Sequence, residues 1–237
     1  MRYAVSDLHG CFNLYEKINS ILTLEDEVIC LGDCNDRGSQ GWELIKAVYN
    51  NPQWTYLMGN HEHLLFHAIA TYFEHVEHKE IFIHGEENPY QDDPIDLLFY
   101  NGGRKTWSGW LSDGADEIWA SNLSGLPTVM SMQNKRGNNI YLTHAGFTIP
   151  VVSNNSFDMT WNRKHILDKW IQDPFYQNSY IIHGHTPCSY IKKNYDISQG
   201  ALKYCDGHKI CIDASSYKSN KCILFNIDDF TSTVISG

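Results

Sequence analysis

Hydrophobic and polar positions in the first third of the chain repeat one pattern three times. Short apolar runs at residues 3–6, 28–31 and 55–58 have the length of buried strands. Each run leads into a polar turn with a glycine, and apolar residues then recur three or four positions apart, as on the buried face of a helix. This order of strand, turn and helix predicts parallel strands joined by helices. The helical positions are Leu14, Ile18, Ile21 and Leu22, then Trp42, Ile45, Val48 and Tyr49, then Leu64, Leu65, Ala68, Ile69 and Tyr72.

The segment from about residue 74 to 126 does not follow this pattern. Loop-forming residues occupy 85–89 and 91–94, and four large aromatic residues follow. We predict a mostly helical insertion, at about residues 74–126, within a single domain that spans residues 1–237. The insertion either lies over the functional site or forms a peripheral helical layer, and its tryptophans are expected in the core. The aromatic residues are Tyr100, Trp107, Trp110 and Trp119.

The strand pattern resumes near residue 127. Apolar runs at 128–132, 140–143 and 179–182 predict strands, and residues 161–171 have the pattern of a helix. Two hairpins are expected near the end, the first with strands 202–204 and 210–212 around the turn at Asp206 and Gly207, the second with strands 222–227 and 232–235. The predicted class is α/β, with two sheets and outer helices.

Charge limits the classes of partner. The chain of 237 residues has 18 basic and 28 acidic residues, which gives a formal net charge of −10. An acidic surface argues against broad binding of nucleic acids or anionic membranes. Affinity for any anionic ligand must then come from local positive charge. The sequence does not determine the oligomeric state.

The cysteines and the start of the chain indicate a cytoplasmic protein. The 7 cysteines are odd in number and form no CxxC pair, so a disulfide framework or a thiolate zinc site is not expected. The N-terminal residues lead directly into a strand, without the pattern of a signal peptide. No apolar run reaches the roughly 18 residues of a membrane span. Cys34 lies within a polar segment and is a candidate for redox sensitivity.

Five polar segments follow the apolar runs and contain most of the chemistry. Each holds or adjoins a glycine, which permits tight turns and close approach of the backbone. In an open α/β sheet, functional side chains gather at the carboxyl ends of the strands. The segments are DLHG at 7–10, GDCNDRG at 32–38, GNHE at 59–62, HAG at 144–146 and GHTP at 184–187.

The residue types in these segments suit two divalent metal ions. Carboxylate oxygens, imidazole nitrogens and an amide oxygen are ligands for such ions. Asp7 and His9 can reach one ion, and the Asp33 carboxylate can bridge two. Two cations about 3.5–4 Å apart can share a water, lower its pKa and hold phosphoryl oxygens, so that the bridging hydroxide attacks phosphorus. The remaining expected ligands are Asn60, His144 and His185.

Further residues in the same segments suit a phosphate ester. His61 lies next to a ligand and is the expected general acid, with Asp36 to orient it. Arg37 and Arg163 offer forked donors that match phosphate oxygens. For Arg163 the chemistry alone leaves open that it is an ordinary solvated residue near a helix start.

The five segments resemble the calcineurin-like metallophosphoesterase superfamily. More narrowly, they resemble the phosphoprotein phosphatases, in the branch of phage and bacterial Ser/Thr phosphatases; WNR at 161–163 and NGG at 101–103 also resemble that branch. The resemblance implies a four-layer α/β/β/α sandwich and two metal ions, usually manganese, with iron or zinc as other candidates. By this resemblance, the first metal is bound by Asp7, His9 and Asp33, and the second by Asp33, Asn60, His144 and His185. His61 would be the general acid, paired with Asp36. The residues that would bind phosphate are Arg37, Asn60 and Arg163.

Three residues distinguish between relatives. Pro187 stands where many phosphodiesterases of the superfamily have a second histidine. Asp36 and Glu62 are both present, whereas the related dinucleoside tetraphosphate hydrolases typically lack this aspartate and have GNHD. The expected substrate is therefore phosphoserine or phosphothreonine in proteins; the alternative is a dinucleoside polyphosphate or another small phosphorylated metabolite. Departures at residues 34–35 and 213–217 leave the substrate preference open.

Overall fold

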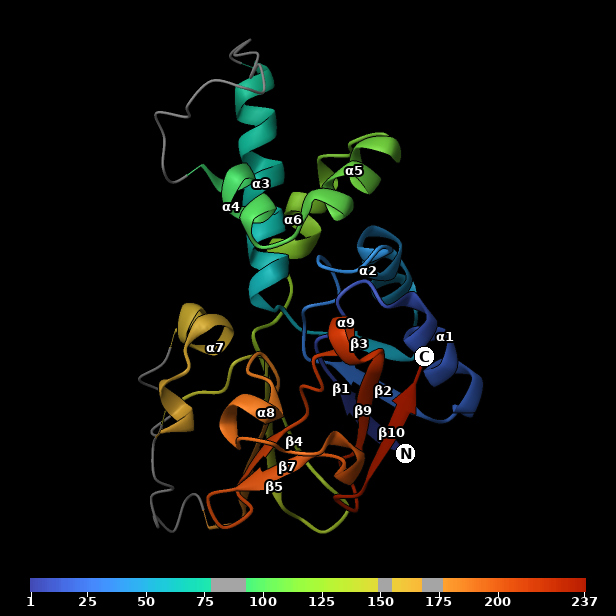
Figure 1. The fold of residues 1–237 in the computed structure, drawn as a ribbon, viewed down its shortest axis with the longest axis vertical. Coiled ribbons are helices and arrows are strands. Elements are labelled where there is room, and N and C mark those ends of the chain that lie inside the picture. The colour runs from blue at the N-terminus through green and yellow to red at the C-terminus, as the bar shows by residue number, and fades with distance from the viewer. Residues whose placement is uncertain (78–92, 149–154, 168–176) are drawn as a thin grey trace.

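A five-stranded mixed sheet contains the three strands of the N-terminal repeat (Figure 1). The computed structural model describes residues 1–77, 93–148, 155–167 and 177–237. In this sheet β1, β2 and β3 are parallel, and β9 and β10 are antiparallel to their neighbours. In spatial order the strands are β10 (Ser232–Ser236), β9 (Lys221–Asn226), β1 (Arg2–Val5), β2 (Glu27–Cys30) and β3 (Trp54–Tyr56).

The second five-stranded sheet is also mixed. Its strands β5, β6 and β8 are parallel, while β4 and β7 are antiparallel edge strands. The β7–β8 pair confirms the hairpin expected around residues 206–207. Every strand expected from the sequence is present, and its bounds agree within two residues. In spatial order the strands are β4 (Val129–Gln133), β5 (Asn139–Thr143), β6 (Ser179–His183), β8 (Lys209–Cys211) and β7 (Leu202–Tyr204).

Helices cover the outer faces of both sheets in the described part of the chain. The three helices expected in the N-terminal repeat are confirmed as α1 (Phe12–Ile21), α2 (Gly41–Asn50) and α3 (Asn60–Glu77). The later ones are α4 (Pro94–Tyr100), α5 (Arg104–Ser112), α6 (Ile118–Ser124), α7 (Ser156–Trp161), α8 (Cys188–Ile191) and α9 (Ser216–Ser219), with the 3-10 turns η2 (Lys164–Ile166) and η3 (Ile197–Gln199).

The helix expected over residues 161–171 is wrong in its described part. Helix α7 begins earlier, at a capping box made by Asn155 and Asp158, and ends at Trp161. Asn162 has an extended backbone, and its side chain accepts from the amide of Lys164 and donates to Asp158. Such local side-chain bonds compete with helix formation, which explains why apolar spacing misled the prediction here. Residues 168–171 lie outside the described residues.

Alternating side chains on the strands build two cores, one on each face of the first sheet. Val5 and Val28 pack in the cluster that includes Leu14 of α1 and Ile45 of α2. Their strand neighbours Ala4 and Ile29 belong instead to a cluster between the two sheets, with Ile140, Leu142, Ile182 and Ile210 opposite. Because successive side chains on a strand point to opposite faces, both faces of this sheet are buried.

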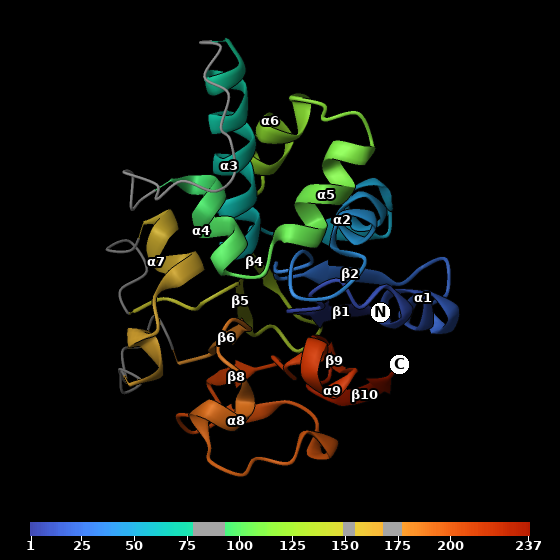
Figure 2. The same ribbon diagram turned by 45° about the horizontal axis from the view of Figure 1, so that its top comes forward.

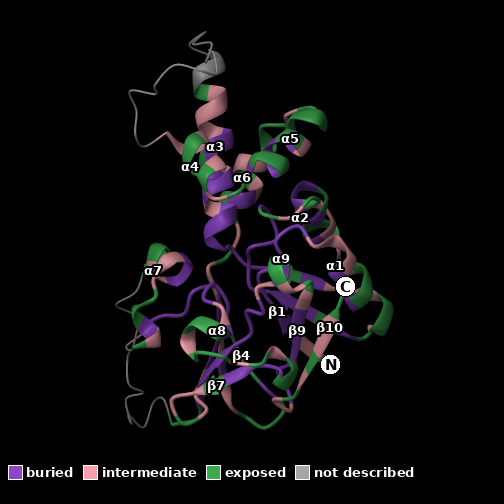
Figure 3. Cartoon of the chain, viewed as in Figure 1, coloured by how far each residue is buried: buried purple, intermediate pink, exposed green. Residues whose placement is uncertain are grey.

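The outer face of the second sheet packs against α7. Ile181 of β6 lies with Phe147 and with Met159 of α7 in a third apolar cluster. Figure 2 shows α1 and α2 on the side of β1 and β2, and α7 on the side of β5. The layers are therefore helix, sheet, sheet and helix, as the expected four-layer α/β/β/α sandwich requires. Buried residues concentrate in the strands and in the adjoining part of α3 (Figure 3).

The described part of the insertion between α3 and β4 packs on α2 and α3 and also contacts the second polar segment. Trp107 and Trp110 are buried in the core shared with α2 and α3, which confirms the expectation for these two tryptophans. The turn before α5 and α5 itself contact the second polar segment: the Gly102 carbonyl oxygen accepts from the Arg37 amide (3.0 Å), and Thr106 Oγ1 accepts from the Asp36 amide (2.9 Å). The loop expected at residues 85–89 lies outside the described residues.

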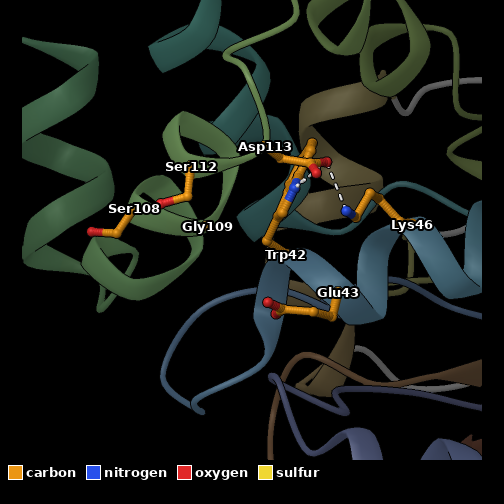
Figure 4. A pocket seen from close by; sticks show the side chains of 7 residues that line it. All are labelled: Trp42, Glu43, Lys46, Ser108, Gly109, Ser112 and Asp113. Atoms are coloured by element: carbon orange, nitrogen blue, oxygen red, sulfur yellow. Dashed lines mark hydrogen bonds and ion pairs between the residues drawn. The ribbon is translucent and has the colours of Figure 1, made fainter.

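One ion pair fastens the insertion to α2 (Figure 4). Asp113 follows α5, and its Oδ2 accepts from Trp42 Nε1 (3.0 Å) and from Lys46 Nζ (2.6 Å). A shallow pocket of about 330 Å³ lies here between α2 and α5, and none of the residues expected in the functional site lines it. No helix in the described residues is long and apolar enough to cross a membrane.

A buried carboxylate ties the loop after β2 to the loop after β3. Glu62 Oε2 accepts from the amides of Asp33 (2.7 Å) and Gly59 (2.8 Å). Its Oε1 accepts from the amide of Cys34 (2.8 Å) and from Tyr56 Oη (2.7 Å). Burial raises the pKa of Glu62, whereas four donors favour the carboxylate form. Glu62 thus fixes the positions of two polar segments relative to each other.

We expect Glu62→Gln to lower the free energy of unfolding by roughly 2–4 kcal/mol, because an amide NH₂ faces donors that need an acceptor. Urea unfolding at neutral pH measures the change. Glu16→Gln, on the exposed side of α1, is the matched control and should stay within about 0.5 kcal/mol of the parent. Equal stability of both variants would contradict this role of Glu62.

Candidate metal centre and active site

The two sheets bring the predicted metal ligands together at the carboxyl ends of their parallel strands. Asp7 and Asp33 follow β1 and β2, and Asn60 begins α3 after β3. His144 and His185 follow β5 and β6 of the other sheet. Every predicted ligand is buried, with at most 7% of its surface exposed. The site therefore lies where loops from both sheets meet.

The backbone around this site is strained in a consistent way. Among the described residues, several with a side chain have φ in the left-handed region, which favours glycine and is uncommon for other residues. Such conformations persist where the surrounding structure enforces them, and they concentrate at functional sites. Those in the predicted site have φ between 45° and 66°: Asp7, His9, Asp33, Asp36, Arg37 and His185.

Two glycines of the polar segments make room for the carboxylates. A Cβ at Gly184 would overlap with Ser6 Oγ and Asp7 Oδ2, and a Cβ at Gly59 would overlap with Asp33 Oδ1. Ser6 Oγ donates to Asp7 Oδ2, which also accepts from the His185 amide (3.0 Å). The glycines in the third and fifth segments are therefore required by close approach of backbone to ligand.

A first group of candidate ligands surrounds one oxygen of Asp33. His9 Nε2 lies 3.6 Å from Asp33 Oδ2 and 3.9 Å from Asp7 Oδ1. His61 Nε2 also faces Asp33 Oδ2, at 3.8 Å. The sequence did not anticipate this last approach, which places the expected general acid at the edge of the first ligand group.

A second group of candidate ligands surrounds the other oxygen of Asp33. His144 Nε2 lies 3.3 Å from Asp33 Oδ1 and 3.0 Å from Asn60 Oδ1. His185 Nδ1 lies 2.8 Å from the same Asn60 oxygen. Asp33 thus faces one ligand group with each carboxylate oxygen, which is the arrangement a bridging ligand needs.

Backbone carbonyl oxygens fix the orientation of all three predicted histidine ligands. His9 Nδ1 lies 2.9 Å from the Asn35 oxygen, His144 Nδ1 2.9 Å from the Leu31 oxygen, and His185 Nε2 3.1 Å from the Trp161 oxygen. An imidazole held in this way turns its other nitrogen toward a metal, as ligating histidines usually do. The donor set and its orientation therefore fit two divalent cations.

Charge interactions within the site are strong because its ionisable groups are buried. Burial would raise the pKa of Asp33, but His144 and His61 hold it well below its usual value. Burial would lower the pKa of His144, but Asp33 and Asp7 raise it to about 10. Burial raises the pKa of Asp7, and Asp33 raises it further. Buried carboxylates and imidazoles of this kind favour bound cations.

His61 and Asp36 form a buried pair beside the metal ligands. His61 Nδ1 lies 2.7 Å from Asp36 Oδ2, and both side chains are fully buried. Burial would lower the pKa of His61, but Asp33 and the hydrogen bond with Asp36 raise it above its usual value. The Arg37 guanidinium donates to His9 Nε2 (2.7 Å) and to His61 Nε2 (2.8 Å). The expected general acid and one of the arginines expected to bind phosphate are therefore adjacent.

A pocket of about 340 Å³ opens over the ligand groups, and both predicted arginines line it. Arg163 reaches it from the segment between α7 and η2, and its Nε donates to Thr186 Oγ1 (3.2 Å). This placement favours the phosphate-binding interpretation of Arg163 over that of a merely solvated residue. Asn60, the third residue expected to bind phosphate, lies in the second ligand group.

Sequence reasoning missed the side chains on the rim of this pocket. Tyr217 lies edge-on to His9 and holds its ring 5.0 Å from the Arg37 guanidinium carbon. Lys218 Nζ lies 5.3 Å from the same ring, and Tyr190 also lines the pocket. The unusual sequence at 213–217 marked this stretch, but its proximity to Arg37 is a property of the fold.

Solved structures of phosphoesterases share this fold at low sequence identity. A putative diadenosine tetraphosphatase matches with a TM-score of 0.58 and 13% identity, covering 100% of this chain and 93% of the other. A cold-active protein-tyrosine phosphatase of Shewanella sp. matches with a TM-score of 0.57 and 17% identity, and the match covers 99% of this chain and 80% of the other. A protein serine/threonine phosphatase from Saccharomyces cerevisiae matches with a TM-score of 0.55 and 12% identity, and the match covers 100% of this chain and 79% of the other. At such identities these likenesses show the fold alone.

The sequence itself matches a family model over most of its length. No curated protein sequence matches the chain significantly. The model of the calcineurin-like phosphoesterases matches residues 3–212, which include all five polar segments. Together with the two-sheet sandwich and its two groups of candidate ligands, this match shows that the chain belongs to the calcineurin-like phosphoesterase family.

Proposed function

We propose that this protein is a metal-dependent phosphatase that hydrolyses phosphoserine and phosphothreonine in proteins. The observation that carries the proposal is the buried pair of His61 and Asp36, with 2.7 Å between Nδ1 and Oδ2. A serine or threonine alkoxide is a poor leaving group and needs a proton, which a positioned imidazole can donate. A nucleotide that leaves from a polyphosphate is already a stable anion and needs such a donor much less.

The residues around the pocket have complementary roles in this proposal. Arg37 and Arg163 bind the phosphate oxygens, since a guanidinium offers forked donors. When Arg37 turns to the phosphate it leaves His61 Nε2, which can then carry the proton for the leaving oxygen. Asp36 holds the imidazole in orientation through Nδ1. Glu62 keeps the loops of Asp33 and Asn60 in register through its backbone contacts.

The proposed cofactor is a pair of divalent cations. The resemblance to the phosphoprotein phosphatases implies manganese, with iron or zinc as the alternatives, and mixed oxygen and nitrogen donors suit such ions. Asp7, His9 and Asp33 would hold one, and Asp33, Asn60, His144 and His185 the other. When bound, such a pair supplies Lewis acidity toward the phosphoryl oxygens and lowers the pKa of a water that becomes the nucleophile. The side-chain amide of Asn60, whose Oδ1 faces His144, would also contact the phosphate.

We further propose a cytoplasmic location. Five of the seven cysteines are buried, namely Cys30, Cys34, Cys188, Cys211 and Cys222. Burial raises the pKa of Cys222 to about 12, which keeps this thiol protonated. Buried, protonated thiols suit a reducing compartment. The expected partner is a phosphoprotein substrate.

Metal-stripped protein re-supplied with manganese should hydrolyse a phosphoserine peptide faster than a dinucleoside tetraphosphate. Phosphate release from the peptide and nucleotide products by chromatography are the measurements. Asp33→Asn should abolish turnover of both, because it weakens both ligand groups. Faster nucleotide turnover would keep the metal mechanism and overturn the proposed substrate; no turnover of either with metal bound would reject the function.

The acid role of His61 is tested with two leaving groups. His61→Asn should reduce kcat for a phosphoserine peptide by about 10²–10⁴-fold. For nitrophenyl phosphate the loss should be much smaller, because nitrophenolate leaves without a proton. His67→Asn, on the exposed side of the same helix, should change neither rate. An equal loss for both substrates would remove His61 from the proton-transfer step.

Metal binding should release a proton from His144. Its pKa of about 10 means that the metal-free protein holds this imidazole protonated at neutral pH, whereas a ligating imidazole must be unprotonated. Because manganese must displace this proton, the affinity for manganese rises with pH below pH 10. The rise is about tenfold between pH 7 and pH 8 if one proton is released. Calorimetry of manganese binding in buffers of different ionisation enthalpy counts the protons. No release, or release that persists in His144→Asn, would contradict this assignment.

A further inference from the structure

The position of Arg163 depends on a short segment that docks on the second sheet. Arg163 itself is exposed, and its Nε donates to Thr186 Oγ1 at 3.2 Å. One such hydrogen bond does not fix a long side chain. The contacts of the residues on either side of it therefore decide where the guanidinium lies.

The segment has a firm anchor before Arg163. The Met159 carbonyl oxygen accepts from the Ala145 amide (2.7 Å) and from Thr143 Oγ1 (3.0 Å). Trp161, two residues before Arg163, directs its carbonyl oxygen to His185 Nε2 (3.1 Å). These contacts hold the end of α7 against the carboxyl ends of β5 and β6.

A second anchor follows Arg163 at His165. This imidazole is buried, with 1% of its surface exposed, and it packs edge-on against His183 with 4.4 Å between ring centres. A Cβ at Gly146, where φ is +90°, would overlap with the ring of His165. The Lys209 ammonium donates to the His165 carbonyl oxygen. The ring therefore fits one position between the HAG turn and the second sheet.

The hydroxyl of Tyr204 connects this anchor to the strand that carries a candidate metal ligand. Tyr204 Oη lies 3.2 Å from His165 Nε2 and 2.8 Å from His183 Nε2. His165 follows Arg163 by two residues, and His183 precedes His185 by two. A hydroxyl donates one hydrogen bond and accepts another. It can therefore link two imidazoles when one presents an N–H and the other an unprotonated nitrogen.

We propose that Tyr204 is a positioning residue, whose hydroxyl fixes Arg163 relative to His185 by bridging His165 and His183. The inference rests on the proposed function, because it assigns Arg163 to the phosphate. The bridge joins the segment that contacts phosphate oxygens to the segment that faces the second ligand group. A displacement of about 1 Å between such groups is enough to weaken transition-state contacts strongly.

Tyr204→Phe removes only the hydroxyl and is the test variant. We expect KM for a phosphoserine peptide, and the Kd of inorganic phosphate measured by calorimetry, to rise by about tenfold, with kcat changed less than about threefold. The control is Tyr195→Phe, whose half-buried hydroxyl bonds to the carbonyl oxygens of Gly200 and Ala201 away from the pocket. It should leave KM and phosphate affinity unchanged.

A double-mutant cycle separates positioning from general stability. In the Arg163→Gln background, Tyr204→Phe should change phosphate affinity by less than about twofold, because the group that it positions is gone. The Kd of manganese should stay within about twofold of the parent in Tyr204→Phe. If Tyr204→Phe does not fold, His165→Phe, which removes the same hydrogen bond from the other side, goes through the same cycle.

The phosphate and manganese titrations distinguish a positioning role of Tyr204 from a general structural role. An undiminished effect of Tyr204→Phe in the Arg163→Gln background overturns the proposal, as does a loss of manganese affinity in place of phosphate affinity. Failure of the parent protein to hydrolyse any phosphomonoester would reject the proposed function instead. In that case the phosphate titrations, which need no turnover, still report whether Tyr204 acts through Arg163.

Discussion

Two buried carboxylates that interact electrostatically, Asp7 and Asp33, are the constraint on which the rest of the site depends. Their mutual repulsion and their loss of water are unfavourable unless positive charge stands between them. The fold supplies part of it through His144, which Asp33 and Asp7 keep protonated in the absence of metal. Metal ions would supply the remainder. The left-handed backbone at both aspartates shows that the surrounding structure enforces this arrangement.

Three features hold the carboxylates in place, and each acts through the backbone. Glu62 binds three loop amides and so connects the ends of β2 and β3. Gly184 allows the fifth polar segment to approach Asp7 more closely than any side chain would permit. Carbonyl oxygens fix the rotation of the ligand histidines. Stability and chemistry are thus coupled, because the same hydrogen bonds order the loops and aim the ligands.

The two arginines proposed to bind phosphate contact or belong to segments outside the two central sheets. The insertion contacts the backbone of Arg37 and Asp36 through Gly102 and Thr106, and the segment after α7 carries Arg163. Tyr217 lies against Arg37 from the short helix α9. In the proposed function, substrate recognition would rest on these peripheral elements, whereas the candidate ligands come from the strand ends. This separation allows related folds to act on different phosphate esters.

The sequence by itself determined the strands, the N-terminal helices and the identity of the candidate ligands, because strand periodicity and glycine-bearing turns are local properties. The same local reasoning was wrong for residues 161–167, where side-chain caps of Asn155 and Asn162 override apolar spacing. Only the tertiary structure decided that His61 approaches Asp33, that Tyr217 covers Arg37, and that Tyr204 bridges His165 and His183. These contacts join residues far apart in the chain, and no local pattern encodes a distance that the packing of two sheets creates.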